Sequence, residues 1–375
     1  LLETQVRADP GASHVWDSVV LGATEAIQRV EAWGMLVDRQ ALLNYQQYLV
    51  DLRKACEAQF AAYPDFNPAS TPAVRNLLYK ELKLEAPKPT DKGAASTDAA
   101  ALQLLGAKYP NHKVLQALLE WRKIAKLDGT YAKGLEEHIR SDGRIHPTLK
   151  IDGAASGRLS CKAPNLQNIP RVDSSSVWGR YPRGIFVPAV GSVYLQVDYS
   201  QLELRIAAML SQDPDMIQIF KDGVDYHQRT AELIAPAAWK IQSSQVTKEH
   251  RTKAKTINFG VLYGMKAGAL AARMQCSERE AETTMRALFG QFRVLNRWIQ
   301  DALRTTQRTG YAWTWWAGRQ ARRRDLSDIA ENDAARRINA ENSSANTPIQ
   351  GTASDFCLRS VVEVVRWIER TRAPA

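Results

Sequence analysis

Four side chains of the segment KEHRTKAKTINFGVLYGM, residues 248–265, recur at intervals of four: Arg251, Lys255, Phe259 and Tyr263. On a helix, at about 100° per residue, they form one slowly drifting stripe that begins with two cations and ends with two rings. A nucleoside triphosphate presents the complementary order, since its anionic phosphates precede a sugar and a flat base. The simpler alternative is an amphipathic helix with solvated cations and core aromatics, and aromatics at helical spacing usually are core.

A lone carboxylate, Asp198, follows an alternating segment. Val193, Leu195 and Val197 alternate along residues 192–200, which predicts a buried strand that ends near Asp198. Mg²⁺ prefers hard oxygens from one or two carboxylates together with phosphate oxygens, so an aspartate held there suits a metal ligand. Position alone favours a helix N-cap instead. Glu203, five residues further on, reads by itself as a surface or salt-bridged glutamate.

The positive charge is concentrated in one segment. The chain carries a formal net charge of +10, and residues 251–324 hold 15 basic and 4 acidic residues, a net of +11. The remainder therefore sums to 10 − 11 = −1. General solubility does not require such a concentration, whereas a nucleic acid or nucleotide phosphates would favour it.

The elements that must position these residues are mostly helices. Hydrophobic spacing predicts helices over residues 15–60, 112–140 and 201–310, and again from residue 331. A small sheet is expected near residues 145–200, and residues 311–326 are expected to form a turn-rich connector. The expected fold class is therefore α+β, dominated by helices.

Composition excludes several other classes. No uncharged apolar run reaches the roughly 18 residues of a membrane span, and we expect no signal peptide from the charged N-terminal residues LLETQVRADP. The cysteines Cys56, Cys161, Cys276 and Cys357 are widely spaced and form no CxxC pair. This excludes a disulfide framework or a zinc knuckle and fits a reducing compartment. We expect a cytoplasmic protein with no membrane partner.

Several ordered motifs resemble those of family A DNA polymerases, the Pol I-like enzymes. The segment DYSQLELR, residues 198–205, is similar to the family's motif A, and RTKAKTINFGVLYG, residues 251–264, to its motif B. SGRLSCKAPNLQNIP, residues 156–170, and TPIQGTASD, residues 347–355, resemble its DNA-contacting segments. The resemblance implies a right-hand fold of thumb, palm and fingers with a small antiparallel palm sheet. Its implied divisions are N-terminal helices and palm entry at 1–66, thumb at 67–145, palm at 146–211, fingers at 212–335 and a palm helix at 336–375.

The resemblance implies template-directed DNA synthesis, in which two Mg²⁺ ions assist transfer of deoxynucleotides to a primer 3′ end, and a viral or bacterial source. Asp198 and Lys255 would be catalytic, and Asp198 and the Tyr199 carbonyl would bind metal. Glu203 would exclude a 2′-hydroxyl, and Phe259, which has no hydroxyl, implies discrimination against dideoxynucleotides. The implied nucleotide-binding residues are Tyr199, Gln201, Glu203, His227, Arg251, Lys255, Phe259 and Tyr263. The implied primer-template contacts are Arg158, Asn165, Gln167, Asn346 and Gln350.

The sequence departs from the family pattern in several places. A third motif, a strand with a His-Asp pair, would follow near Ala375, and no aspartate follows Asp355. We therefore expect synthesis to need a missing C-terminal segment or a second polypeptide that carries it. Asn342 stands where the family often has a basic residue, and no exonuclease domain is expected. Two alternatives remain: a catalytically incomplete fragment that binds primer-template and nucleotide, and a single-subunit RNA polymerase, which Glu203 disfavours.

Overall fold

The computed structural model describes residues 2–87, 93–170 and 180–371. The chain forms two compact units and passes between them four times. The first unit comprises Leu1–Arg29, Leu149–Ser160 and Gln196–Ala375, and the second comprises Val30–Thr148 and Cys161–Leu195. Parts of the domains expected at 1–66, 67–145, 146–211 and 336–375 lie outside the described residues, and that division stays a prediction.

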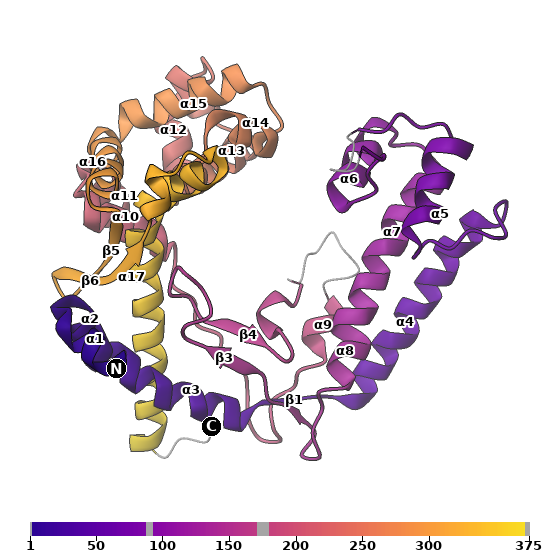
Figure 1. Ribbon diagram of the computed structural model, residues 1–375, viewed down its shortest axis with the longest axis horizontal. Helices are drawn as coiled ribbons and strands as arrows, with labels where there is room; N and C mark the ends of the chain where they lie inside the picture. The colour runs from indigo at the N-terminus through magenta and orange to yellow at the C-terminus, as the bar shows by residue number, and fades with distance from the viewer. Residues whose placement is uncertain (1, 88–92, 171–179, 372–375) are drawn as a thin grey trace. The chain divides into compact units, whose positions relative to one another are not determined.

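The second unit is built around two helices that lie side by side, α4 (Arg39–Glu57) and α7 (Lys113–Leu127) (Figure 1). Tyr45 and Leu49 of α4 pack with Ile124 of α7 in one buried cluster. Strands β1 (Met35–Leu36) and β2 (Arg144–Ile145) pair antiparallel. The other helices of this unit are α5 (Thr71–Asn76), α6 (Ala99–Lys108), α8 (Lys133–Glu136) and α9 (Arg180–Gly184).

The first unit contains most of the helices. Its largest buried cluster joins α10 (Leu202–Ser211), α13 (Lys248–Leu262) and α17 (Ala334–Thr371) through Leu204, Ile257 and Ile349. Its other helices are α1 (Leu2–Ala8), α2 (Pro10–Val15), α11 (Pro214–Lys221), α12 (Tyr226–Ala238), α14 (Ala267–Met274), α15 (Glu278–Gln291) and α16 (Arg293–Thr309). Helix α3 (Leu21–Trp33) begins in this unit.

Short elements complete the chain. Strands β3 (Thr148–Lys150) and β4 (Ser160–Lys162) form a two-stranded sheet. Single π-helical turns occur at Trp16–Val20, Leu77–Glu81 and Asp128–Ala132, and 3-10 turns at Ala58–Phe60, Leu166–Asn168, Ser243–Gln245 and Ser327–Ala330. The helix-dominated α+β class expected from the sequence is confirmed.

The turn-rich connector expected at 311–326 is wrong, because these residues form a β-hairpin. Strand β5 (Tyr311–Trp316) pairs antiparallel with β6 (Arg319–Asp325), and the hairpin lies against α17 (Figure 1). Ala317 and Gly318 both have positive φ, 49° and 80°, as a tight two-residue hairpin turn requires. A register shift between Trp313 and Trp315 marks a bulge.

The buried strand expected at residues 192–200 is also wrong. Residues 192–199 have no regular secondary structure and form no strand pair with any of the described residues, and Val193, Leu195 and Val197 are 87%, 86% and 83% exposed. An alternating sequence becomes a strand only when a neighbour supplies the ladder of hydrogen bonds and an apolar face to cover it. The alternation was real, but the described chain supplies no such neighbour.

Candidate nucleotide and nucleic-acid site

Helix α13 begins with a capping box, which sets the residue at which the helix starts and so the positions of the four-residue stripe on it. The Thr247 hydroxyl accepts from the backbone N–H of His250, and the His250 ring nitrogen accepts from the backbone N–H of Thr247. Arg251, Lys255 and Phe259 then follow on the helix, and Tyr263 caps its C-terminal end. We call these four residues the α13 ridge.

The cationic end of the α13 ridge is already engaged by a carboxylate of the same unit. Arg251 donates to both oxygens of Asp225, Nε to Oδ1 at 3.2 Å and Nη2 to Oδ2 at 2.7 Å. Asp225 also caps α12 by accepting from the backbone N–H of Gln228. These bonds, the Arg251 bond first, hold the pKa of Asp225 below its ordinary value. A phosphate that bound Arg251 through these two N–H groups would therefore have to replace this carboxylate.

His227, the expected phosphate contact, lies inside the fold and is only 4% exposed. Burial is the main cause that lowers its pKa to about 4, and Lys255 and Arg251 add to it. Thr230 donates to the carbonyl of Tyr226 and accepts from the Asn258 amide, whose NH₂ group also reaches Nδ1 of His227 at 3.1 Å. The neutral ring therefore carries its proton on Nε2.

The aromatic end of the α13 ridge is half-buried. The His227 and Phe259 ring centres lie 5.6 Å apart, and those of Phe259 and Tyr263 lie 6.2 Å apart in a stacked arrangement. Phe259 packs on the edge of the main hydrophobic cluster. Phe259 thus packs against the core, as the amphipathic-helix alternative expects, and the nucleotide-binding interpretation of the stripe stays a prediction.

Glu203 connects the start of α10 with the ring end of the α13 ridge. Tyr263 donates its hydroxyl to Oε2 of Glu203 at 2.5 Å, and Arg158 donates to Oε1. Gln350 also hydrogen-bonds the Tyr263 side chain. Burial and then the bond to Glu203 raise the pKa of Tyr263. The structure thus brings together four residues that lie far apart in the sequence.

The loop that carries Arg158 is clamped from the hairpin and from α17. Arg322 of β6 forms an ion pair with the fully buried Asp355 of α17, and Ser354 donates to the carbonyl of Gly157. Gly157 has φ +79°, a backbone conformation that favours glycine, and a Cβ there would lie 2.6 Å from Nη2 of Arg322, so a side chain would also displace that guanidinium. Burial raises the pKa of Asp355 to about 6, although Arg322 opposes the shift.

Asn342 of α17 packs against Gly264, in the turn that follows the α13 ridge. Gly264 has φ +70°, and a Cβ there would lie 2.7 Å from the Cα of Asn342. On the same helix, Oδ1 of Asn346 is buried and has no hydrogen-bond partner among the described residues. A buried amide oxygen of this kind is free to accept from a ligand.

Asp198 is exposed and lies in the irregular segment before α10. Tyr199 is anchored to α17, since its hydroxyl lies 2.7 Å from the Ser360 hydroxyl, and Gln201 caps α10 in the left-handed conformation with φ +57°. Asp198 is thus in the same unit as the α13 ridge and five residues from Glu203. The described residues contain no cluster of three or more His, Cys, Asp or Glu side chains able to hold a metal. They therefore do not by themselves fit two Mg²⁺ ions.

Two expected DNA contacts, Asn165 and Gln167, belong to the second unit. Asn165 caps a 3-10 turn by accepting from the backbone N–H of Gln167. Their proposed role beside the residues of the first unit stays a prediction.

Sequence reasoning missed the residues that hold the site in place. Asp225 has a helix-cap signature, Asp followed by helical spacing, but nothing local points to Arg251, 26 residues later. Asp213 likewise caps α11 and also accepts from the backbone N–H groups of Val294 and Leu295 at the start of α16. The pairing of Arg322 with Asp355 had no sequence signal.

None of the described helices is long and apolar enough to cross a membrane.

Comparison with known proteins gives one consistent result. The model of DNA polymerase family A matches residues 39–375. DNA polymerase I of Caldicellulosiruptor bescii is 33% identical over 342 residues, which are 90% of this chain and 38% of that protein. Thermostable DNA polymerase I of Thermus aquaticus is 33% identical over 352 residues, 92% of this chain and 40% of that protein.

Among solved structures, the chain is similar to the POL domain of Pol1 from M. smegmatis in complex with DNA primer-template and dNTP. The TM-score is 0.81 at 33% identity, over 94% of this chain and 60% of that one. This similarity confirms the polymerase fold expected from the motifs. The chain spans about two fifths of the length of the curated relatives it matches. On these grounds the chain belongs to DNA polymerase family A.

Proposed function

We propose that this chain carries out template-directed DNA synthesis, adding deoxynucleotides to a primer 3′ end by phosphoryl transfer. The observation that carries the proposal is the hydrogen bond between Tyr263 and Glu203, because it joins motif A to the ring end of the α13 ridge. Family membership and the similarity to a polymerase domain with bound primer-template and dNTP support it.

The phosphates would bind the cationic end of the α13 ridge. Arg251 presents a planar fork that suits phosphate oxygens, and Lys255 presents a compact charge one turn further along. Lys255 would also hold a proton close to the leaving pyrophosphate. His227, neutral at pH 7 with its proton on Nε2, would donate a hydrogen bond without adding charge.

The sugar and base would lie over Phe259 and Tyr263. Glu203, held by Arg158 and Tyr263, would exclude a 2′-hydroxyl and so select deoxynucleotides. Gln201 and Tyr199 would complete the nucleotide side of the site. Movement of Tyr263 away from Glu203 would accompany closure on the nucleotide, a gating step.

The primer-template would be gripped through its minor groove and backbone. Arg158, Asn346 and Gln350 of the first unit are the proposed contacts, with Asn165 and Gln167 of the second. Minor-groove acceptors are shared among correct base pairs, so these side chains would test pair shape without reading sequence. Phosphate contacts make the affinity fall as salt rises.

Metal binding is the incomplete part of the proposal. Asp198 and the Tyr199 carbonyl are the proposed ligands, and a pair of Mg²⁺ ions needs further carboxylate charge. We propose that a further segment, in cis or from a second polypeptide that carries the third family motif, supplies it.

The second candidate function is binding without synthesis. It is favoured by the lack of any metal-binding cluster among the described residues. Primer extension with Mg²⁺ separates the two: the chain alone, and the chain with a polypeptide carrying the third motif, are each given primer-template and deoxynucleotides. Extension by the mixture, and not by the chain alone, supports the proposal as stated. Binding with no extension in either case favours the second candidate.

A further inference from the structure

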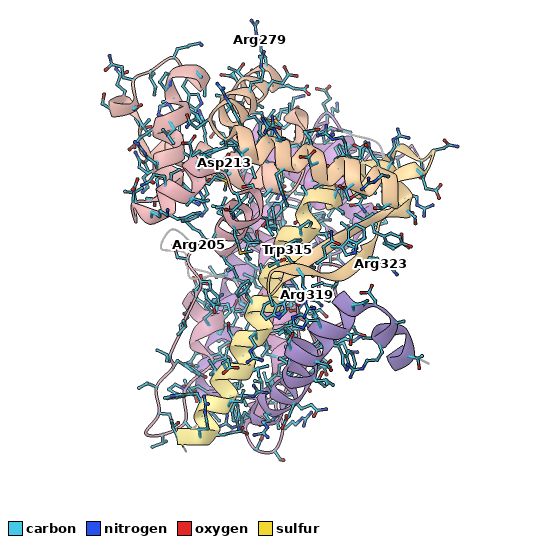
Figure 2. All side chains as sticks on the ribbon, turned by 90° about the vertical axis from the view of Figure 1, so that its left-hand side faces the viewer. Arg205, Asp213, Arg279, Trp315, Arg319 and Arg323 are labelled. Carbon is cyan, nitrogen blue, oxygen red and sulfur yellow. The ribbon has the colours of Figure 1, made fainter. Side chains whose placement is uncertain are left out.

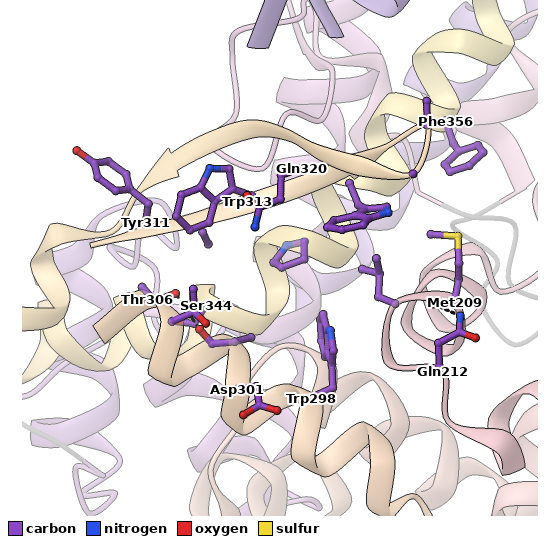
Figure 3. Close-up of a pocket in the computed structure, with 18 residues that line it drawn as sticks. Met209, Gln212, Trp298, Asp301, Thr306, Tyr311, Trp313, Gln320, Ser344 and Phe356 are labelled. Carbon is purple, nitrogen blue, oxygen red and sulfur yellow. Dashed lines mark hydrogen bonds between the residues drawn. The ribbon is translucent and has the colours of Figure 1, made fainter. Parts of the chain in front are cut away.

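A hollow lined by rings lies elsewhere in the first unit, between the hairpin, α16, α10 and α17. Its volume is about 770 Å³. Figure 3 shows Trp313 and Gln320 on the hairpin side of it and Trp298 of α16 opposite, while Tyr311 lines one end with its ring turned outward. Trp315 and Phe356 also line it. We call this hollow the ring pocket, and its size is that of a small-ligand site.

Few polar groups line the ring pocket, and Asp301, the carboxylate on its wall, is already paired with an arginine. Gln212, Asp301 and Gln320 are among the polar side chains on the wall. Asp301 forms an ion pair with Arg304 at 2.5 Å, so this carboxylate adds little free negative charge. The wall therefore suits a flat, largely apolar group.

Cations flank the ring pocket at both ends. At one end Arg323 lies over the Tyr311 ring, 4.4 Å from its centre. At the other end Arg319 follows the hairpin turn, and Met209 is shared with a smaller hollow of about 330 Å³ that is lined by Arg205 and Lys221. Figure 2 shows Arg205, Trp315, Arg319 and Arg323 on one face of the molecule.

We propose that this face binds a segment of single-stranded DNA, with unstacked bases in the ring pocket and phosphates on Arg323 at one end and on Arg319 and Arg205 at the other. Stacking rings between cations match a polymer of flat bases joined by anions, whereas a duplex keeps its bases stacked inside. The wall offers few hydrogen-bonding groups, so binding is independent of sequence.

This site is separate from the proposed site of synthesis. None of the residues that line the ring pocket belongs to the α13 ridge, to the Arg158 loop or to the proposed DNA contacts. The inference goes beyond the proposed function and does not depend on it, because it requires neither nucleotide nor metal.

The test is the binding of a short fluorescent oligothymidylate by the chain, measured by anisotropy with a saturating blunt duplex present and no nucleotide. Trp315, 37% exposed, is the residue to change. Trp315→Ala is expected to weaken binding about tenfold, and Trp315→Phe, which keeps a ring, to change it little. Arg319→Ala and Arg323→Ala are each expected to reduce the salt slope by about 0.7. Arg279→Ala, an exposed arginine of α15 far from the pocket in Figure 2, is the matched control and should change neither.

Three results would overturn the proposal. The first is unchanged affinity in Trp315→Ala. The second is equal binding of an abasic strand of the same length, which would leave only phosphate attraction. The third is displacement of the oligonucleotide by the blunt duplex, which would place the strand in the primer-template site. Failure of the proposed synthesis is scored separately, by primer extension.

Discussion

At the proposed nucleotide site Arg251, Glu203 and Tyr263 already have partners within the chain, whereas the rings of the ring pocket face a hollow. Arg251 is bound by Asp225, and Glu203 by Arg158 and Tyr263. The ring pocket instead has a preformed cavity with cations at its ends. A ligand that binds Glu203, or the N–H groups of Arg251 that Asp225 occupies, would exchange existing bonds, which favours selectivity, while a flat group could enter the ring pocket without breaking a hydrogen bond of the rings that line it. The predictions below test that contrast.

The largest expected effect is on sugar selectivity. Glu203→Ala removes the carboxylate proposed to exclude a 2′-hydroxyl, so the preference for deoxy- over ribonucleotides should fall by about 100-fold or more. The measurement is the ratio of dissociation constants for the two nucleotides on a chain-terminated primer-template. Glu282→Ala, an exposed glutamate of α15, is the control. An unchanged ratio in Glu203→Ala would mean that another residue sets selectivity.

The Arg322–Asp355 pair connects the two regions, because it joins the hairpin to α17 behind the Arg158 loop. Burial raises the pKa of Asp355 to about 6 from its ordinary value of 3.8, so between these values the folded protein binds a proton that the unfolded chain has released. The free energy of unfolding should therefore fall as pH rises from about 4 to about 6, by up to ~3 kcal/mol. Urea unfolding across this range should show a shallower decline for Asp355→Asn, and parallel curves would contradict the assignment.

The next effect concerns the 3′ side of the sugar. Phe259 has no hydroxyl to replace a missing 3′-OH, so dideoxynucleotides should be used poorly. Phe259→Tyr should reduce this discrimination about tenfold, the value of one hydrogen bond in a desolvated site. Competition between dideoxy- and deoxynucleotide measures it. Near-equal use by the unaltered protein would show that Phe259 does not lie beside the sugar.

The smallest expected effect tests the exchange of partners at Arg251. Asp225→Asn keeps the helix cap, because asparagine caps as well as aspartate, but removes the charge that competes with a phosphate. Triphosphate binding should tighten about threefold, since the exposed pair is worth little. Arg251→Ala should weaken it instead. Weaker binding in Asp225→Asn, measured by nucleotide titration, would mean that Asp225 orients Arg251 productively.

Local patterns predicted the α13 ridge and most helices, because four-residue spacing and capping residues act within one turn. These local patterns could not predict contacts between segments that lie far apart in the sequence. The Glu203–Tyr263 bond spans 60 residues, and only the resemblance to the family placed those residues at one site.

The two wrong predictions have one cause. Residues 192–199 alternate like a strand yet have no pairing partner among the described residues, whereas residues 311–325 contain their own partner. Alternation of apolar and polar residues predicts which face of a sheet each side chain would lie on. Whether the segment forms a strand depends on a neighbouring segment that can hydrogen-bond with its backbone. Ala317–Gly318 between aromatic and basic runs was the available signal for the hairpin.

The most direct test of synthesis at the α13 ridge is nucleotide binding to the chain on a dideoxy-terminated primer-template, where no extension can occur. The deoxynucleotide complementary to the templating base should bind more tightly than the three others, and Lys255→Ala should weaken that binding. Equal affinity for all four nucleotides, or binding indifferent to Lys255, would contradict the proposal.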